Sequence, residues 1–366
     1  MPAAAENRDN RLERLLKPLV TPAVFDFWAG RLRPGLSWER PLARVVARHE
    51  EARDAVTLEL QPNRHFHGFR PGQHINVTAE VDGSRVTRSY SLTGIPATGG
   101  RIGITVRRVG GGRLSNQLCD HCQPGDVLEI GQAFGELALP ATGEPLLFLA
   151  AGSGITPLMS LTRAMAADGM PVPLTLIYWA GTRAELCFAR ELQALAAREP
   201  AFTLHLVLTR EAVRPIGAES GRISAGQLQA LVPDLARRHV VGCGPAGFIA
   251  SARELAGGTA ASFQAEAFTP PAPLATDDAA VRDVRVTLQA SGRTLTVSTG
   301  DSLLEALEAQ GLRPAHGCRM GICNSCACAK LDGVSQDLHS GEQNADPVSA
   351  LRLCVSRARG DITLDL

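Results

Sequence analysis

The sequence has 366 residues, of which 45% are hydrophobic and 20% charged, and its formal net charge is zero. This length allows two or three domains with buried cores, and the balanced charge argues against a nucleic-acid-binding protein. No apolar run reaches the roughly 20 residues of a membrane span, and the N-terminus lacks the pattern of a signal peptide, so we expect a cytoplasmic protein with reduced thiols.

Residues 1–38 form an amphipathic extension ahead of the first predicted domain. Residues 1–50 hold nine Lys or Arg against six Asp or Glu. The extension predicts a helix that packs across the rest of the protein. A docking surface for a membrane or for a membrane-bound partner is the alternative.

Residues 39–141 alternate short apolar strands with turns about every ten residues, a pattern typical of an antiparallel β-barrel. In the motif RSYS, Arg88 can clamp a pyrophosphate and Tyr90 can stack on a flat ring. The glycine-rich stretch 110–118 can present backbone N–H groups to phosphates, with a short helix opening at Ser115. The nearby pair C-x2-C has no second ligand pair, so we expect both cysteines to pack in the core.

Residues 142–268 change to a strand-then-helix pattern, which predicts a parallel sheet with ligands at the carboxyl ends of its strands. Two glycine turns, AGSGITP and VGCGPAG, follow two of these strands. Arg183 and Arg210 come after two others, and no acidic residue directly ends either strand. A lone arginine there is often a surface residue, but two favour the 2′-phosphate of NADPH over NADH.

Residues 269–282 are rich in Pro, Ala and Asp and predict a linker that lets the C-terminal domain swing. Residues 283–366 begin with two alternating strands around an SG turn. We expect Asp301 to cap a helix that ends at Gly311. A late strand carries Cys354.

Four cysteines of this last region have the spacing of a plant-type [2Fe–2S] site. Cys318, Cys323 and Cys326 form C-x4-C-x2-C, and Cys354 lies 28 residues downstream. Thiolates are good iron ligands, and glycines beside the cysteines permit a tight loop. Zinc is the alternative, but structural zinc sites usually combine two short ligand pairs. Cys328 is predicted to be a small core residue.

A [2Fe–2S] centre moves one electron at a time, whereas NAD(P)H gives two as a hydride. A flavin bridges this difference because it accepts a hydride and releases single electrons. The cluster therefore predicts a flavin site and a nicotinamide site upstream, where RSYS and the glycine turns lie.

The order PGQ (71–73), RSYS, GGRLS, AGSGITP, VGCGP and C-x4-C-x2-C resembles ferredoxin–NADP reductase-type modules fused to a C-terminal plant-type ferredoxin. The resemblance covers roughly residues 40–366. It implies a multidomain α+β protein with an antiparallel β-barrel FAD domain, an α/β parallel-sheet nucleotide domain and a β-grasp ferredoxin domain.

The resemblance also implies roles for residues that match the motifs. Around FAD, Arg88 would hold the pyrophosphate, Tyr90 would stack on the isoalloxazine, Ser91 would lie near flavin N5, and the phosphates would meet Gly112, Leu114 and Ser115. The nicotinamide nucleotide would lie on Gly152, Gly154, Ile155 and Thr156, with Cys243, Gly244 and Pro245 under its reactive ring. Thr209 and Arg210, with Arg183, would face the ribose 2′-phosphate. Tyr90, Ser91 and Cys243 would be closest to the hydride path, and Cys318, Cys323, Cys326 and Cys354 would hold the cluster.

We therefore expect a reductase that passes electrons from NADPH through FAD and [2Fe–2S] to an oxygenase. The N-terminal extension resembles those of reductases that serve bacterial membrane fatty-acyl desaturases, so such a desaturase is the leading acceptor. This would place the protein in the cytoplasm at the inner face of the membrane. Alternatives are a soluble ring- or alkane-hydroxylating oxygenase or a hybrid-cluster protein as acceptor, a redox or nitric-oxide sensor without turnover, and an electron carrier that binds no nucleotide.

Overall fold

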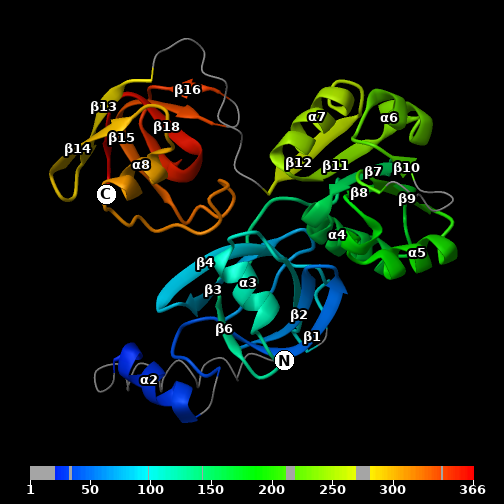
Figure 1. The fold of residues 1–366 in the computed structure, drawn as a ribbon, viewed down its shortest axis with the longest axis horizontal. Coiled ribbons are helices and arrows are strands. Elements are labelled where there is room, and N and C mark those ends of the chain that lie inside the picture. The colour runs from blue at the N-terminus through cyan, green and yellow to red at the C-terminus, as the bar shows by residue number, and fades with distance from the viewer. Residues whose placement is uncertain are drawn as a thin grey trace, which may run out of the picture.

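The computed structural model describes residues 21–32, 35–97, 99–141, 143–211, 219–268, 281–338 and 341–366. Within them the chain forms three sheets, each the centre of its own domain (Figure 1). The arrangement confirms the predicted α+β class with an antiparallel, a parallel and a mixed sheet. Most of the predicted extension and residues 269–280 of the predicted linker lie outside the described residues.

The first sheet is an antiparallel barrel in the order β4-β3-β6-β1-β2-β5. Its strands are β1 (Leu42–Ala52), β2 (Ala55–Pro62), β3 (His74–Val81), β4 (Ser84–Ser91), β5 (Ile102–Arg107) and β6 (Val127–Ile130), and α3 (Arg113–Asp120) follows β5. Leu92, directly after β4, pairs with Ile104 of β5 and so closes the barrel. Cys119 and Cys122 are buried in this core, as predicted for the C-x2-C pair.

The second sheet is parallel, in the order β10-β9-β8-β7-β11-β12. Its strands are β7 (Leu146–Ala151), β8 (Leu174–Ala180), β9 (Phe202–Leu208), β10 (Glu219–Ser220), β11 (His239–Gly244) and β12 (Ser262–Ala267). Helices α4 (Ile155–Ala167) and α5 (Ala189–Arg198) pack on one face, and α6 (Ala225–Leu231) and α7 (Ala246–Ala256) pack on the other. Three short 3-10 turns complete the domain: η1 (Gly152–Gly154), η2 (Arg183–Glu185) and η3 (Leu235–Arg237).

The third sheet has the order β14-β13-β18-β15-β16, and β17 pairs with β15. Its elements are β13 (Asp283–Leu288), β14 (Arg293–Ser298), α8 (Leu303–Ala309), β15 (Ala327–Asp337), β16 (Gln343–Asn344), β17 (Val348–Arg352), η4 (Leu353–Val355) and β18 (Ser356–Leu364). The hairpin, the helix and the parallel pairing of β13 with β18 give the expected ferredoxin-like arrangement.

One predicted cap is wrong. Ser302, and not Asp301, caps α8, because its hydroxyl accepts a hydrogen bond from the Glu305 N–H and donates one to the Glu305 carboxylate. Ser302 and Glu305 have the S-x-x-E spacing typical of a helix N-terminus, and Asp301 lies one residue too early for it.

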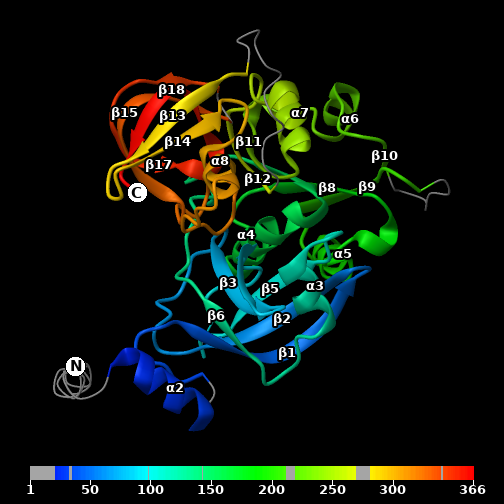
Figure 2. The same ribbon diagram turned by 60° about the vertical axis from the view of Figure 1, so that its left-hand side comes forward.

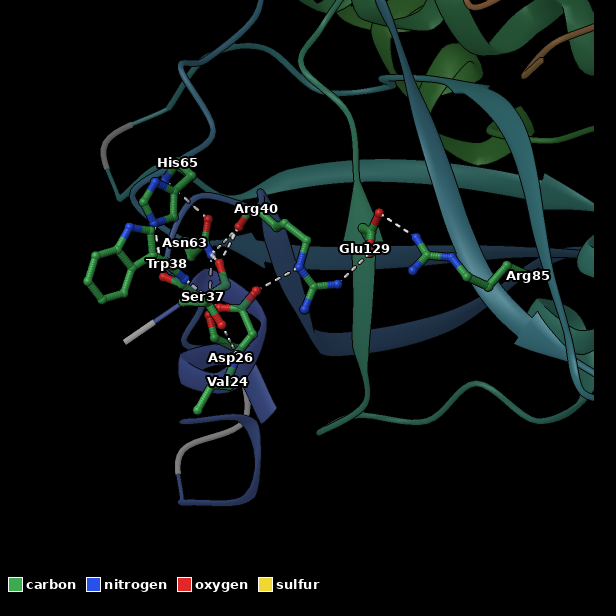
Figure 3. A network of polar contacts seen from close by, with 11 residues as sticks. Val24, Asp26, Ser37, Trp38, Arg40, Asn63, His65, Arg85 and Glu129 are labelled. Carbon is green, nitrogen blue, oxygen red and sulfur yellow. Dashed lines mark hydrogen bonds and ion pairs between the residues drawn. The ribbon is translucent and has the colours of Figure 1, made fainter. Parts of the chain in front are cut away.

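Helix α2 (Pro22–Leu32) is joined to the barrel by ion pairs and hydrogen bonds (Figure 3). Asp26 accepts from the Trp38 N–H at 2.6 Å and from Arg40 Nε at 2.9 Å, and Arg40 also contacts Glu129 of β6 at 2.9 Å. Asp26 thus ties α2 to residues 38–40, just ahead of β1, and packing across the rest of the protein stays a prediction. Phe27 and Trp28 of this helix are 53% and 58% exposed.

The three domains surround a common centre, with the ferredoxin domain and the parallel-sheet domain both next to the barrel (Figures 1 and 2). Among the described residues, no helix has the length and apolar character needed to cross a bilayer.

Candidate functional site

A cavity of about 530 Å³ lies where the three domains meet. Its wall comes from the barrel, from the loop after β7, from the residue that follows β12 and from the loop ahead of β15. The lining residues are His74, Arg88, Ser89, Tyr90, Ser91, Thr105, Arg107, Val109, Gly110, Gly111, Gly112, Arg113, Leu114, Ser115, Ser153, Thr156, Phe268, Cys318, Arg319 and Met320. The structure thus brings together all the predicted FAD residues and one predicted cluster ligand.

The end of β4 forms one side of this cavity. Burial raises the pKa of Tyr90, so its phenol stays protonated. Tyr90 lines the cavity, and an aromatic ring there can stack on a flat ligand. The Arg88 side chain is exposed at the cavity and donates to the Thr87 carbonyl at 2.7 Å. Ser91 is 4% exposed, and its hydroxyl has no hydrogen-bond partner among the described residues. A buried hydroxyl left unpaired fits a site whose ligand supplies the missing partner.

The glycine stretch and the start of α3 form a second side. A Cβ on Gly112 would lie 2.4 Å from Ser115 Oγ, so only glycine fits this approach to the helix. Gly112 is the N-cap and gives α3 no side-chain cap, which leaves the first N–H groups of the helix for another acceptor. Such an uncapped helix start, with Arg88 across the cavity, suits a pyrophosphate. The residues present therefore fit FAD.

The loop after β7 forms the third side. A Cβ on Gly154 would lie 2.0 Å from the Cys243 carbonyl oxygen, so the turn η1 after β7 touches the backbone at the end of β11. Strand order reverses here, since β8 and β11 flank β7 on opposite sides, and such a switch point is where α/β sheets bind nucleotides. Ile155 and Thr156 are buried at the start of α4.

Several predicted nucleotide residues lie close to this cavity without lining it. Cys243 is fully buried, and burial with the nearby Glu266 charge raises its thiol pKa well above the ordinary value. The Cys243 thiol is therefore neutral and buried near the carboxyl end of β11. Gly244 packs tightly on Ala151 and Phe248, and Pro245 is the N-cap of α7.

The predicted phosphate-binding arginines occupy neighbouring strand ends. Arg210 contacts both carboxylate oxygens of Glu185, at 2.8 and 2.9 Å, and a Cβ on Gly181 would collide with its guanidinium. Gly181 therefore leaves the room in which Arg210 lies. The Arg183 N–H donates to Glu211 at 2.6 Å, and Thr209 Oγ1 donates to the Ala180 carbonyl at 3.2 Å.

Glu185 also joins the nucleotide domain to the barrel. Arg53 and Arg107 of the barrel contact it at 2.7 and 2.9 Å. Burial opposes ionisation of this carboxyl, but the bond from Arg53 and the charges of Arg107 and Arg210 together lower its pKa. Three guanidiniums therefore surround this one carboxylate at the domain boundary.

The sequence analysis did not identify three residues at or beside the cavity: His74, Glu266 and Phe268. His74 is 1% exposed, stacks on Phe134 and has Phe268 edge-on at 5.8 Å between ring centroids. Its Nε2 lies 3.2 Å from Glu266 Oε2 without an aligned hydrogen bond. Burial lowers the pKa of His74 to about 4 and raises that of Glu266 to about 7. The sequence offered one clue, for His74 alone, because this residue directly follows the PGQ motif.

The predicted cluster ligands lie together at the edge of the ferredoxin domain. The Cys318 thiol is within hydrogen-bonding reach of those of Cys323 and Cys354, and Cys326 is within reach of Cys354. Backbone N–H groups point at two of the sulfurs: Cys318 N lies 3.2 Å from Cys323 Sγ, and Met320 N lies 3.3 Å from Cys318 Sγ.

Such N–H donors stabilise the charge of a thiolate-bound cluster, so this donor set fits [2Fe–2S]. Across the described ranges, no three His, Cys, Asp or Glu side chains converge on one point as the ligands of a single ion do. A two-iron cluster divides its four sulfurs between two metals.

Comparison with known proteins identifies the same three domains. Residues 42–138 match the oxidoreductase FAD-binding domain family, residues 148–254 the oxidoreductase NAD-binding domain family, and residues 286–359 the 2Fe-2S iron-sulfur cluster binding domain family.

Full-length relatives share the whole arrangement. The chain is 32% identical over 364 residues to an NADPH oxidoreductase of Mycobacterium tuberculosis, covering 97% of this chain and 92% of the relative. It is 30% identical over 350 residues to the glycine betaine monooxygenase reductase subunit of Pseudomonas aeruginosa, covering 89% and 95%. The solved structure of phthalate dioxygenase reductase matches with a TM-score of 0.59 and 25% identity, covering 89% and 97%. The protein is therefore an oxidoreductase of the ferredoxin–NADP reductase-type flavoproteins that carry a C-terminal plant-type [2Fe–2S] ferredoxin domain.

Proposed function

We propose that the protein is an NADPH-dependent flavo-iron–sulfur reductase that delivers single electrons to an oxygenase. The observation that carries this proposal is the shared cavity, whose wall holds the RSYS motif, Thr156 of the nucleotide loop and Cys318 of the cluster loop. When bound, FAD accepts a hydride and releases single electrons, and a [2Fe–2S] cluster carries one electron at a time.

The chain's own residues would act mainly by binding and orienting. Tyr90 would stack on the isoalloxazine, and the unpaired hydroxyl of Ser91 would hydrogen-bond the cofactor. Arg88 and the N–H groups at the start of α3 would hold the pyrophosphate. The backbone turn at Gly154 would let the nicotinamide end approach the strand ends. Holding two rings in contact is the main catalytic contribution that the protein makes.

Four thiols, of Cys318, Cys323, Cys326 and Cys354, would ligate the cluster. The bonds from Met320 N and from the backbone N–H of Cys323 to Cys318 Sγ would stabilise negative charge on that sulfur. Loss of such a donor is expected to affect the reduction potential of the cluster more than the rate of flavin reduction.

The preference for NADPH rests on Arg210. Arg210 follows the end of β9, and its guanidinium is bound by Glu185 of η2. The Arg210 side chain is 66% exposed. The substitution Arg210→Gln is expected to raise KM for NADPH at least roughly tenfold and to change KM for NADH little, because only NADPH carries the 2′-phosphate. Steady-state reduction of ferricyanide with each nucleotide measures this. A parent protein that prefers NADH would contradict the assignment.

The acceptor is proposed from the relatives. Reductase subunits of glycine betaine monooxygenase and of 3-ketosteroid-9-alpha-monooxygenase are among them, which favours an oxygenase. As the specific acceptor we propose a membrane fatty-acyl desaturase, supported by the exposed Phe27 and Trp28 on α2. These side chains would dock at the inner face of the membrane.

A soluble ring- or alkane-hydroxylating oxygenase, or a hybrid-cluster protein, is the second candidate. An NADH oxidoreductase named HCR of Escherichia coli is 30% identical over 287 residues. Reconstitution with each acceptor and NADPH separates the candidates by product formation. A desaturase that gives no product while a soluble oxygenase turns over would overturn the first choice.

A further inference from the structure

The cluster loop of the ferredoxin domain is hydrogen-bonded to the FAD barrel. Asn76 lies in β3 of the barrel, opposite Ser89 of β4. Its amide nitrogen donates to Ser325 Oγ at 3.2 Å, across 249 residues of sequence. Ser325 lies between the predicted cluster ligands Cys323 and Cys326. The bond therefore joins the flavin domain directly to the loop that would hold the cluster.

Asn76 is suited to this position because its amide offers an acceptor, Oδ1, and a donor, Nδ2, to two different partners. The Ser89 hydroxyl donates to Asn76 Oδ1 at 2.6 Å, which fixes the orientation of the amide. Its nitrogen then points at Ser325, whose hydroxyl is in hydrogen-bonding reach of the Cys323 sulfur. One line of hydrogen bonds thus runs from the RSYS motif to a predicted cluster ligand.

The ferredoxin side of the contact is shaped to receive this amide. A Cβ on Gly317 would lie 3.1 Å from Asn76 Oδ1 and 3.2 Å from Asn76 Nδ2, closer than side chains normally pack. Gly317 directly precedes Cys318, which lines the flavin cavity with Arg319 and Met320. The loop therefore has a glycine where the barrel residue enters, next to the thiol nearest the flavin site.

We propose that Asn76 is a docking latch that holds the cluster loop against the barrel, and so is a positioning residue for electron transfer from the flavin to the cluster. The proposal rests on the reductase function proposed above. It assigns to Asn76 no contact with either cofactor. A single amide contact is weak enough to release, so the ferredoxin domain could leave the barrel to meet an acceptor.

The first test measures docking without any turnover. Hydrogen–deuterium exchange is compared between the full-length holoprotein and its Asn76→Ala variant. Loss of the latch should raise exchange roughly threefold to tenfold at the loop 317–326, because one neutral hydrogen bond usually contributes that much to an equilibrium. Thr78→Val is the matched control, since Thr78 lies on the same strand and its hydroxyl lies 2.7 Å from that of Thr87, a partner within the same domain.

The second test divides the reaction into two steps. After rapid mixing with NADPH, Asn76→Ala should reduce its flavin at the rate of the parent protein and its cluster roughly threefold to tenfold more slowly. Ser325→Ala removes the other partner of the hydrogen bond. It should likewise leave the rate of flavin reduction unchanged and slow the reduction of the cluster. Thr78→Val should change neither step.

The outcomes are distinguishable. Unchanged exchange at the loop 317–326 in both Asn76→Ala and Ser325→Ala overturns the latch. Equal slowing of flavin and cluster reduction, or no slowing of either, overturns the positioning role. If NADPH fails to reduce the flavin of the parent protein, the proposed function fails, while the exchange experiment still decides whether Asn76 holds the loop.

Discussion

At the scale of single residues, the nucleotide site depends on a position that tolerates no side chain. Gly154 has φ −61°, which any residue can adopt, so its requirement is for space and not for backbone freedom. A Cβ there would meet the backbone of Cys243 and Gly244 at 2.0 to 2.6 Å. Sequence alone showed two glycines after a strand, but not which of them touches another strand.

Gly154→Ala should therefore push the turn after β7 away from the end of β11. We expect a loss of about 1–3 kcal/mol in unfolding free energy, as for other overpacked sites, together with a higher KM for NADPH. Gly226→Ala in α6 is the control, because a Cβ on Gly226 would meet nothing within 4 Å and alanine favours helix. Urea denaturation and nucleotide kinetics of both variants give the comparison. Equal effects would contradict the steric account.

Glu185 gives a pH-dependent prediction. Its folded-state pKa lies below the ordinary 4.5, so its contribution to stability is present above that value and is lost as pH falls through the folded pKa. Glu185→Gln should cost about 2 kcal/mol at pH 7, and the difference from the parent should shrink below pH 4.5.

The control for this prediction is Glu144→Gln. Glu144 and Arg237 are 53% and 74% exposed and lie 3.6 Å apart. An exposed pair contributes about 0–1 kcal/mol, so its loss should change stability little at either pH. Urea midpoints across pH measure both variants. A difference for Glu185→Gln that grows toward acid would show that the sign is wrong.

At the scale of elements, the two predicted helix starts lie within two residues of the observed ones. Ser115 was expected to open α3, which begins at Arg113, and Asp301 was expected to cap α8, which Ser302 caps. The one-residue error at α8 arises because Ser302 and Glu305 have the spacing S-x-x-E that Asp301 lacks. The strands of the barrel and of the parallel sheet followed from periodicity, since alternating and continuous apolar runs are local signals.

Ser302→Ala should accordingly cost about 1 kcal/mol of stability, the usual contribution of an N-cap hydroxyl. Asp301→Ala should change stability by no more than about 0.5 kcal/mol, as expected of an exposed residue outside the cap. Chemical denaturation of the two variants with the cluster bound compares them directly. A larger loss for Asp301→Ala would restore the original assignment.

At the scale of the whole molecule, the relation between domains was beyond the reach of sequence. Motifs predicted that flavin, nucleotide and cluster residues exist, but contacts such as Asn76 with Ser325 and Arg53 with Glu185 join residues far apart in the chain. Neither residue of such a contact belongs to a local sequence pattern that would predict its partner. His74, Glu266 and Phe268 were missed for the same reason, because each matters only through its neighbours from another element or domain.

The central claim is that this arrangement takes electrons in pairs at one site and releases them singly at another. Anaerobic rapid mixing of the holoprotein with NADPH tests it, with flavin and cluster absorbance followed together and frozen samples examined by electron paramagnetic resonance. The account predicts that flavin absorbance falls first and that a rhombic cluster signal then grows. Purified protein with no flavin absorbance, or a cluster reduced while the flavin stays oxidised, would contradict it.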